Sequence, residues 1–221
     1  MATLNCSLQQ AASEFAAQAR SFLSAAEGLD ERELLDPARC RGWSRLDAVV
    51  HVRVGLDEMS AVAGVHSRAP IDHDAASYWR THPDDRDADP VPHILVLRRT
   101  ASAYQRPASA VRHLTEVVHR AIAVVDGMPD QPVAFQGKTL AAGDFVATWV
   151  VELAVHQLDL ALHDAPPGAA WHARRWRLWP TRGCRTLWTM RRRSWSDSVV
   201  TPGRRTFHAR TASRSASETS P

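Results

Sequence analysis

Apolar residues recur at three- and four-residue steps along most of the first 165 residues, a spacing that predicts amphipathic helices. Ser44, followed three residues later by Asp47, forms a capping pattern that predicts the start of the second helix, and Asp144 is expected to cap the last one. The inward face of the second helix is expected to carry Leu46, Val50, Val54 and Met59. The predicted helices span about residues 7–27, 44–64, 92–104, 108–125 and 145–163.

The segments between these helices differ in character. Residues 66–92 are rich in proline and aspartate, which predicts a long solvated loop. Residues 132–140 are short, alternate in polarity and contain a turn signal, which predicts a small hairpin. Together the segments indicate an all-α fold, a helical bundle with one long loop.

The composition changes abruptly after Pro166-Pro167-Gly168. Residues 1–170 carry 15 Lys and Arg against 22 Asp and Glu, whereas residues 171–221 carry 12 Arg, 2 acidic residues and five of the eight tryptophans. We therefore predict a bundle domain over 1–168 and a disordered or poorly structured tail over 169–221.

Two interpretations of this tail remain open. Arginine with tryptophan suits a nucleic-acid-binding arm, because guanidinium groups neutralise phosphates and indoles stack on bases. An out-of-frame or degraded C-terminal domain explains the same composition, including the absence of lysine. We favour the second interpretation, and nucleic-acid binding is not expected because the bundle is acidic.

Several functional classes are excluded. No stretch reaches the ~18 apolar residues of a membrane-spanning helix, since the best candidate contains Glu152. The N-terminal residues show no secretion signal, so a cytoplasmic protein is expected. Cys6, Cys40 and Cys184 form no paired motif and are expected to be free thiols.

The last predicted helix carries the strongest chemical signal. Glu152 and His156 lie four residues apart, so their side chains leave the same face of an otherwise apolar helix. His51 occupies a comparable position in the second helix. Two imidazoles and one carboxylate, with a fourth position left open, form the ligand set of a catalytic zinc site. Asp159, three residues after His156, is placed either to orient the ring of His156 or His51 or to be solvated.

Each of these residues has a simpler explanation. A single histidine on an apolar face is often a hydrogen-bonded core residue, and Glu–His pairs at this spacing are common on exposed helix surfaces. Seven of the other histidines share no spacing and are predicted to lie at the surface: His66, His73, His82, His93, His113, His119 and His163.

Two sequence motifs resemble one known family. Residues 42–51 (GWSRLDAVVH) are similar to the first signature of the mycothiol-dependent maleylpyruvate isomerase family, within the DinB/YfiT-like superfamily. Residues 148–160 (TWVVELAVHQLDL) resemble the second. The resemblance covers about residues 8–165. It implies a DinB-like four-helix bundle whose divalent metal, usually zinc, is held by His51, Glu152 and His156.

The resemblance also implies an activity. Members are thought to use a metal and a small thiol, mycothiol, to attack a small electrophilic substrate, as isomerases or transferases. The isomerase itself has a C-terminal domain that contributes to the substrate pocket, and residues 169–221 show no recognisable counterpart. A non-catalytic metal-binding module lacking that domain is therefore the alternative function.

Overall fold

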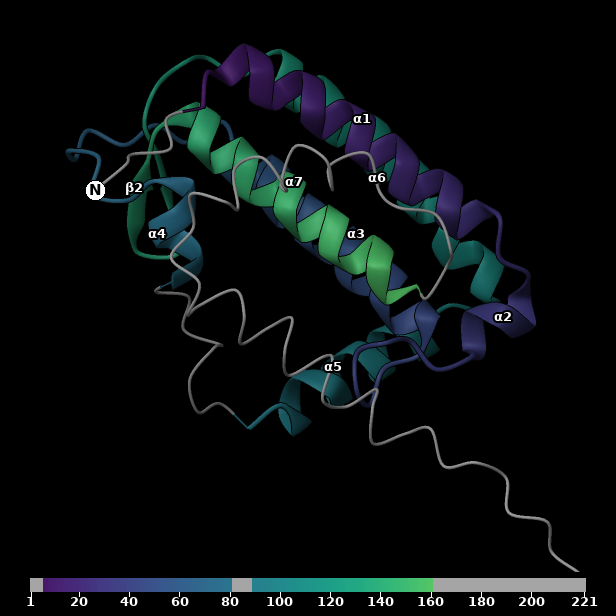
Figure 1. The fold of residues 1–221 in the computed structure, drawn as a ribbon. Coiled ribbons are helices and arrows are strands. Elements are labelled where there is room, and N and C mark those ends of the chain that lie inside the picture. Colours follow the sequence, from purple (N-terminus) through teal and green to yellow (C-terminus); the bar gives the residue numbers. More distant parts are fainter. Residues whose placement is uncertain (1–5, 81–88, 161–221) are drawn as a thin grey trace, which may run out of the picture.

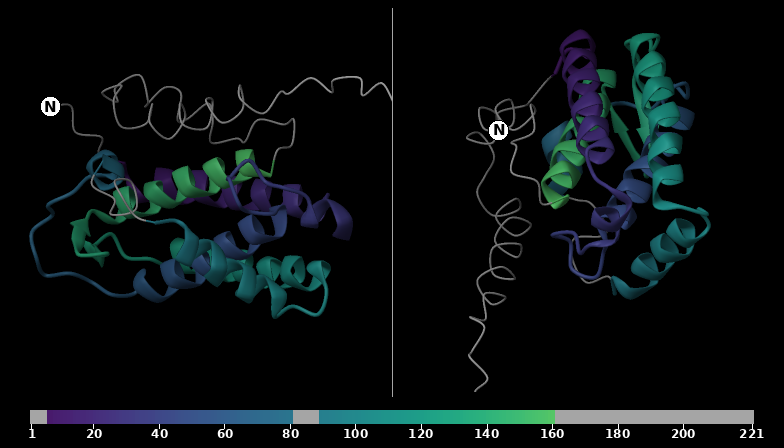
Figure 2. Two further views of the ribbon diagram at one scale, coloured as in Figure 1. Left: turned by 90° about the horizontal axis from the view of Figure 1, so that it is seen from below. Right: turned by 90° about the vertical axis from the view of Figure 1, so that its right-hand side faces the viewer.

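Four long helices form the body of the protein. The structure, a computed structural model, describes residues 6–80 and 89–160. The long helices run side by side in Figure 1, and Figure 2 shows the same arrangement from two other directions. They are α1 (Leu8–Glu27), α3 (Arg45–Val62), α6 (Pro107–Asp126) and α7 (Ala142–Asp159). The predicted all-α fold is confirmed.

The helices contact one another in a ring. α1 packs extensively against both α6 and α7, and α6 packs against α3. The contact between α3 and α7, which closes the ring, is the least extensive of the four. This contact, which we call the α3–α7 seam, is where polar side chains from both helices are found.

Shorter elements lie around the bundle (Figure 1). The hairpin and α4 lie near one end, α2 lies near the other, and α5 packs against α3. The hairpin forms as expected, with its two strands paired antiparallel. These elements are α2 (Glu31–Leu35), α4 (Ala75–Arg80), α5 (Val91–Ser102), β1 (Val133–Phe135) and β2 (Lys138–Leu140).

The two shortest helices, α2 and α4, were not predicted from the sequence. α4 forms within residues 66–92, so the prediction of a loop there is wrong for these residues. Each short helix begins with reciprocal hydrogen bonds between polar side chains and backbone. Asp30 and Glu33 form a capping box at α2. At α4 the Ser77 backbone N–H donates to Asp74 Oδ1 at 2.6 Å, and the Asp74 N–H donates to Ser77 Oγ at 2.8 Å. Helices of five or six residues are too short to show a hydrophobic period.

The predicted start of the second helix is confirmed, but one of its expected core residues is wrong. Ser44 is the N-cap of α3, and Asp47 completes its capping box. Val54 is 41% exposed, whereas Val52 and Leu56 are buried. Leu46, Val50 and Met59 are buried as predicted, so the buried surface of α3 includes most of the predicted face and is wider than it, because α3 contacts α6 and α5 as well as α7.

The start of the last helix also differs from the prediction. α7 has Ala141 as its N-cap, so Asp144 lies inside the first turn and is not the cap. The Phe145 N–H already donates to the Ala141 carbonyl at 2.9 Å, the bond that begins the helix. The turn is packed closely against the start of α1, since a Cβ added to Gly143 would lie 1.9 Å from the Cys6 carbonyl oxygen.

Buried polar side chains tie α1 to α7. Gln18 donates to the Gln157 side-chain oxygen at 2.7 Å, and Gln157 donates to Ser21 Oγ at 2.9 Å. Because Gln157 follows His156 in the chain, these hydrogen bonds to α1 hold in place the turn of α7 that carries His156. Buried polar groups of this kind are costly unless they are paired.

Several predictions fall on parts of the chain outside the described residues. These are the tail over 169–221, Cys184, the end of the last helix beyond residue 160, and His82 and His163. Within the described residues, Cys6 and Cys40 are not joined in a disulfide. Among the described residues, no helix has the length and apolar character needed to cross a membrane.

Candidate metal centre

Three polar side chains meet at the α3–α7 seam. His51 comes from the middle of α3, while Glu152 and His156 come from successive turns of α7. His51 Nε2 lies 3.0 Å from Glu152 Oε1, and His156 Nε2 lies 2.9 Å from the same oxygen. One candidate ligand atom from each residue lies within 4.8 Å of the other two. The structure therefore brings together the three residues that the sequence singled out; their role as metal ligands stays a prediction.

The site is partly open to solvent. The side chain of His156 is 8% exposed, while those of His51 and Glu152 are 24% and 23% exposed. A small pocket reaches this point along the seam, lined by His51, Gly55, Trp149, Glu152 and Leu153 among others. Apolar walls with a few converging polar groups are the usual form of a small-molecule site.

Burial and charge set the protonation of the three groups. Burial would raise the pKa of Glu152, but the two imidazoles that contact it hold that pKa well below its usual value. Burial would lower the pKa of His156, but Glu152 and then Asp159 raise it well above the usual value. Burial lowers the pKa of His51. The protein without metal therefore holds a Glu152 carboxylate against a His156 imidazolium.

A second carboxylate fixes the other nitrogen of His156. His156 Nδ1 lies 3.0 Å from Asp159 Oδ2, and Asp159 is fully buried. The thiol of Cys40 donates to the same oxygen at 2.9 Å. In the neutral His156 ring, this contact favours the tautomer that carries hydrogen on Nδ1, which leaves Nε2 available to a cation. A carboxylate at the outer nitrogen is the usual support for a metal-binding histidine. The position of Asp159 beside His156 agrees with its predicted role as an orienting group.

Cys40, His156 and Asp159 form a second group whose candidate ligand atoms lie within 4.8 Å of one another. It uses the opposite nitrogen of His156, and its carboxylate is fully buried. Asp159 Oδ2 contacts both Cys40 and His156, so this group lies on the opposite side of the His156 ring from Glu152 and His51. Cys40 gave no signal in the sequence, since it lies in a loop distant from α7 along the chain.

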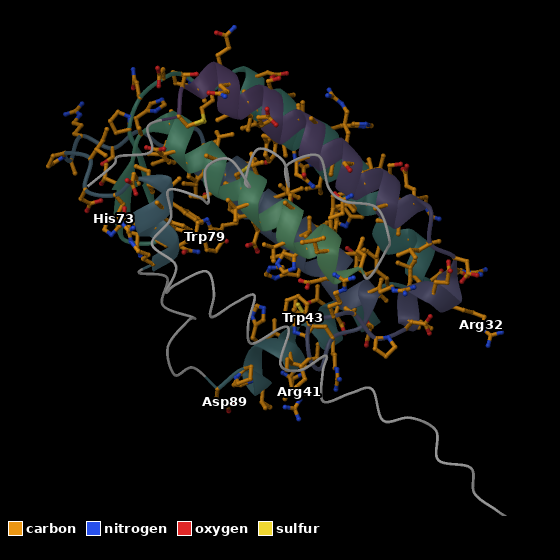
Figure 3. The ribbon with its side chains drawn as sticks, viewed as in Figure 1. Arg32, Arg41, Trp43, His73, Trp79 and Asp89 are labelled. Atoms are coloured by element: carbon orange, nitrogen blue, oxygen red, sulfur yellow. The ribbon has the colours of Figure 1, made fainter. Side chains whose placement is uncertain are left out.

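Aromatic rings from two further segments lie beside His51 and His156. The Trp43 ring stacks on His156, with centroids 5.8 Å apart and planes 12° apart, and lies 5.0 Å from His51. His93 from α5 lies 5.7 Å from Trp43 and 5.6 Å from His51, centroid to centroid. Figure 3 shows Trp43 in the region between α7 and α5. His93 is exposed, as predicted, but the sequence did not reveal that it lies beside the site.

The donor set suits a divalent cation. Two imidazole nitrogens and one carboxylate oxygen from two helices face one another, and the partial exposure of His51 and Glu152 leaves one side of the group open to solvent. Zinc accepts these ligands in tetrahedral sites that keep one position open. The carboxylate on His156 Nδ1 supplies the outer contact that such sites require. The residues present therefore fit the metal that the sequence motifs imply.

Comparison with known proteins places this arrangement in a family. The family model of the mycothiol maleylpyruvate isomerase N-terminal domain matches residues 15–161. The chain belongs to this family. The match spans α1 to the end of α7, so it includes all three residues of the candidate metal centre. No curated protein matches the chain.

Solved structures agree with this assignment at the level of the fold. A crystal structure of the mycothiol-dependent maleylpyruvate isomerase is similar with a TM-score of 0.52 and 15% sequence identity, over 74% of this chain and 65% of that one. The structure of a histidine-to-alanine mutant of that isomerase has a TM-score of 0.50 and the same identity, over 75% and 65%. The chain thus covers 65% of the length of these relatives, and it shares their fold.

Proposed function

We propose that the domain binds one divalent cation, zinc, through His51, Glu152 and His156. The observation that carries the proposal is the convergence of both Nε2 atoms on one Glu152 oxygen, with Asp159 supporting His156 from behind. A partly exposed carboxylate between two imidazoles leaves one side of the site accessible, and a catalytic zinc site needs that access.

We further propose that the site serves a thiol-dependent isomerase or transferase. When bound, zinc lowers the pKa of a thiol that reaches its open side, which supplies a nucleophile at neutral pH. The residues of the chain hold the cation, fix the His156 ring and cover one face of the site with Trp43. Membership of the mycothiol isomerase family supports mycothiol as that thiol.

The substrate class follows from this chemistry. The thiolate sulfur forms a bond to one carbon of a double bond conjugated to a carbonyl, and the electron pair of that double bond moves to the carbonyl oxygen as an enolate. The former double bond is then single and rotates. When the enolate electron pair returns, the carbon–sulfur bond breaks and the double bond re-forms in the other geometry, so the thiolate is returned unchanged. A transferase would instead retain the carbon–sulfur bond, and the enolate would take a proton from water at its α-carbon. Both outcomes use the same nucleophile.

Metal analysis tests the first part of the proposal. We expect one zinc per chain in the wild type after loading and dialysis, and loss of stoichiometric zinc in His51→Ala and Glu152→Ala. Glu58→Ala is the matched control, because Glu58 is an exposed carboxylate on the same helix as His51. Equal zinc content in all four proteins contradicts the assignment of the ligands.

Turnover tests the second part. The zinc-loaded protein is expected to convert a small maleyl-type acid only when a thiol is present, and Glu152→Ala is expected to lose that activity. Stoichiometric zinc without turnover with any thiol supports the alternative function, a non-catalytic metal-binding module.

A further inference from the structure

His93 approaches the candidate metal centre from a third element of the fold. It lies in the first turn of α5, whereas the three candidate ligands come from α3 and α7. Its ring is 5.6 Å from that of His51 and nearly perpendicular to it, at 81°. In the described part of the chain, no hydrogen-bonding partner of the His93 ring is found. Its nitrogens are therefore available to a ligand.

The packing of α5 explains why His93 lies there. Gly42 has a φ of +88°, and a Cβ at this position would lie 3.0 Å from Ile94 Cδ1, so Ile94 packs directly on the Gly42 backbone. Arg98, one turn further along α5, donates to the Gly42 carbonyl at 2.9 Å. The residue after Gly42 is Trp43, whose ring lies against His93, His51 and His156. The same loop thus positions both α5 and the aromatic side of the centre.

The distances place His93 just outside the metal ligands. It is not part of the group whose ligand atoms lie within 4.8 Å of one another. A molecule bound at the open side of a zinc ion has its first atom roughly 2.0 to 2.3 Å from the metal, so a residue one layer further out meets that molecule and not the ion. Neutral imidazole offers one hydrogen-bond donor and one acceptor, and it can therefore pair with a thiol sulfur or with a carboxylate oxygen.

We propose that His93 binds the small molecule that occupies the open side of the His51–Glu152–His156 centre. The inference rests on the proposed function, because it assigns to His93 a contact with the thiol used there. His93 is then a ligand-binding residue contributed by α5, and the candidate site extends over three helices and the loop that contains Trp43.

The test separates thiol binding from metal binding. Cobalt(II) replaces zinc, its affinity is measured by competition with a chelator, and N-acetylcysteine is the probe thiol. Thiol binding is followed under anaerobic conditions by calorimetry and by the near-ultraviolet absorbance of cobalt. His93→Ala is expected to weaken thiol binding about threefold to tenfold, the loss of one hydrogen bond, with cobalt affinity unchanged. His93→Gln, which keeps a donor and an acceptor, is expected to restore part of the loss.

His119→Ala is the matched control, because His119 is an exposed histidine on α6 and is expected to leave both affinities unchanged. Thiol affinity equal to wild type in His93→Ala overturns the inference. A fall in cobalt affinity in that variant also overturns it, because His93 would then be a metal ligand. If the wild-type protein binds no cobalt, or binds cobalt but no thiol, the proposed function is overturned together with the inference. This failure is seen in the wild type itself, whereas failure of the inference alone is seen only in His93→Ala.

Discussion

Two carboxylates hold the His156 ring, Glu152 at Nε2 and Asp159 at Nδ1. Glu152 and Asp159 lie on the same helix as His156, so helical spacing alone brings them to its two nitrogens. Pairing with His51 depends on how two helices pack; the residue pattern suggested this pairing, and the family motifs supported it. Cys40 and His93 were missed as members of the site, because their positions follow from a loop and from the docking of α5, and neither has a periodic signature.

Asp159 is expected to control metal affinity through His156. In Asp159→Asn the ring loses its charged acceptor at Nδ1, and we expect zinc affinity to fall roughly 10- to 100-fold. Chelator competition measures the change. Asp130→Asn is the control, since Asp130 is exposed and distant in sequence from the site. Cys40→Ser keeps a donor to Asp159 and should change the affinity little. Loss of stability without loss of zinc affinity in Asp159→Asn would show a purely structural role.

Zinc binding is expected to release a proton from His156. Its pKa is raised well above the usual value in the metal-free protein, which favours the charged ring, and a charged ring must lose a proton before Nε2 binds a cation. His51 has a lowered pKa and Glu152 remains ionised, so neither adds a second proton. Zinc affinity should therefore rise about tenfold per pH unit below the folded pKa of His156 and level off above it.

The same shift acts on the stability of the metal-free protein, with a defined sign. The folded pKa of His156 lies above its unfolded value, so its charge stabilises the fold fully below that unfolded value, near 6.5, and the contribution is lost as pH rises through the folded pKa.

Calorimetry in two buffers of different ionisation enthalpy tests the predicted proton release, because it counts the protons that zinc binding releases. Heats that do not depend on the buffer would contradict a charged His156.

At the scale of elements, hydrophobic spacing predicted the long helices and missed the details that depend on contacts. The apolar stripe of α1 that includes Phe15, Ala19, Phe22 and Ala26 is buried. The exposure of Val54 and the start of α7 were predicted wrongly, because neighbouring helices decide which face is covered and where the first turn begins. Local propensity gives an element its type, and packing sets its rotation and its ends.

The junction between α1 and α7 leaves no room for a side chain at Gly143. A Cβ there would lie 1.9 Å from the Cys6 carbonyl oxygen, which is backbone and moves only if the start of α1 moves. We expect Gly143→Ala to lower the free energy of unfolding by about 2 to 4 kcal/mol, even though alanine favours helices. Denaturant unfolding measures the loss.

Gly64→Ala is the control for this substitution, since no atom lies within 4 Å of a Cβ added at Gly64. It should leave stability within about 0.5 kcal/mol of wild type. A Gly143→Ala protein as stable as this control would show that α1 and α7 do not meet at this point.

Across the described part of the molecule, the candidate centre joins segments far apart in the chain. His51 and Glu152 are separated by 101 positions, and α7 is the last described helix. During synthesis, α3 therefore leaves the ribosome with a single imidazole and no partner for it. Its two companions emerge only when translation reaches the end of the bundle. Under the proposed function, loading with the ion is consequently a late event in the life of each new polypeptide, and a chain interrupted before residue 142 lacks two of the three proposed ligands.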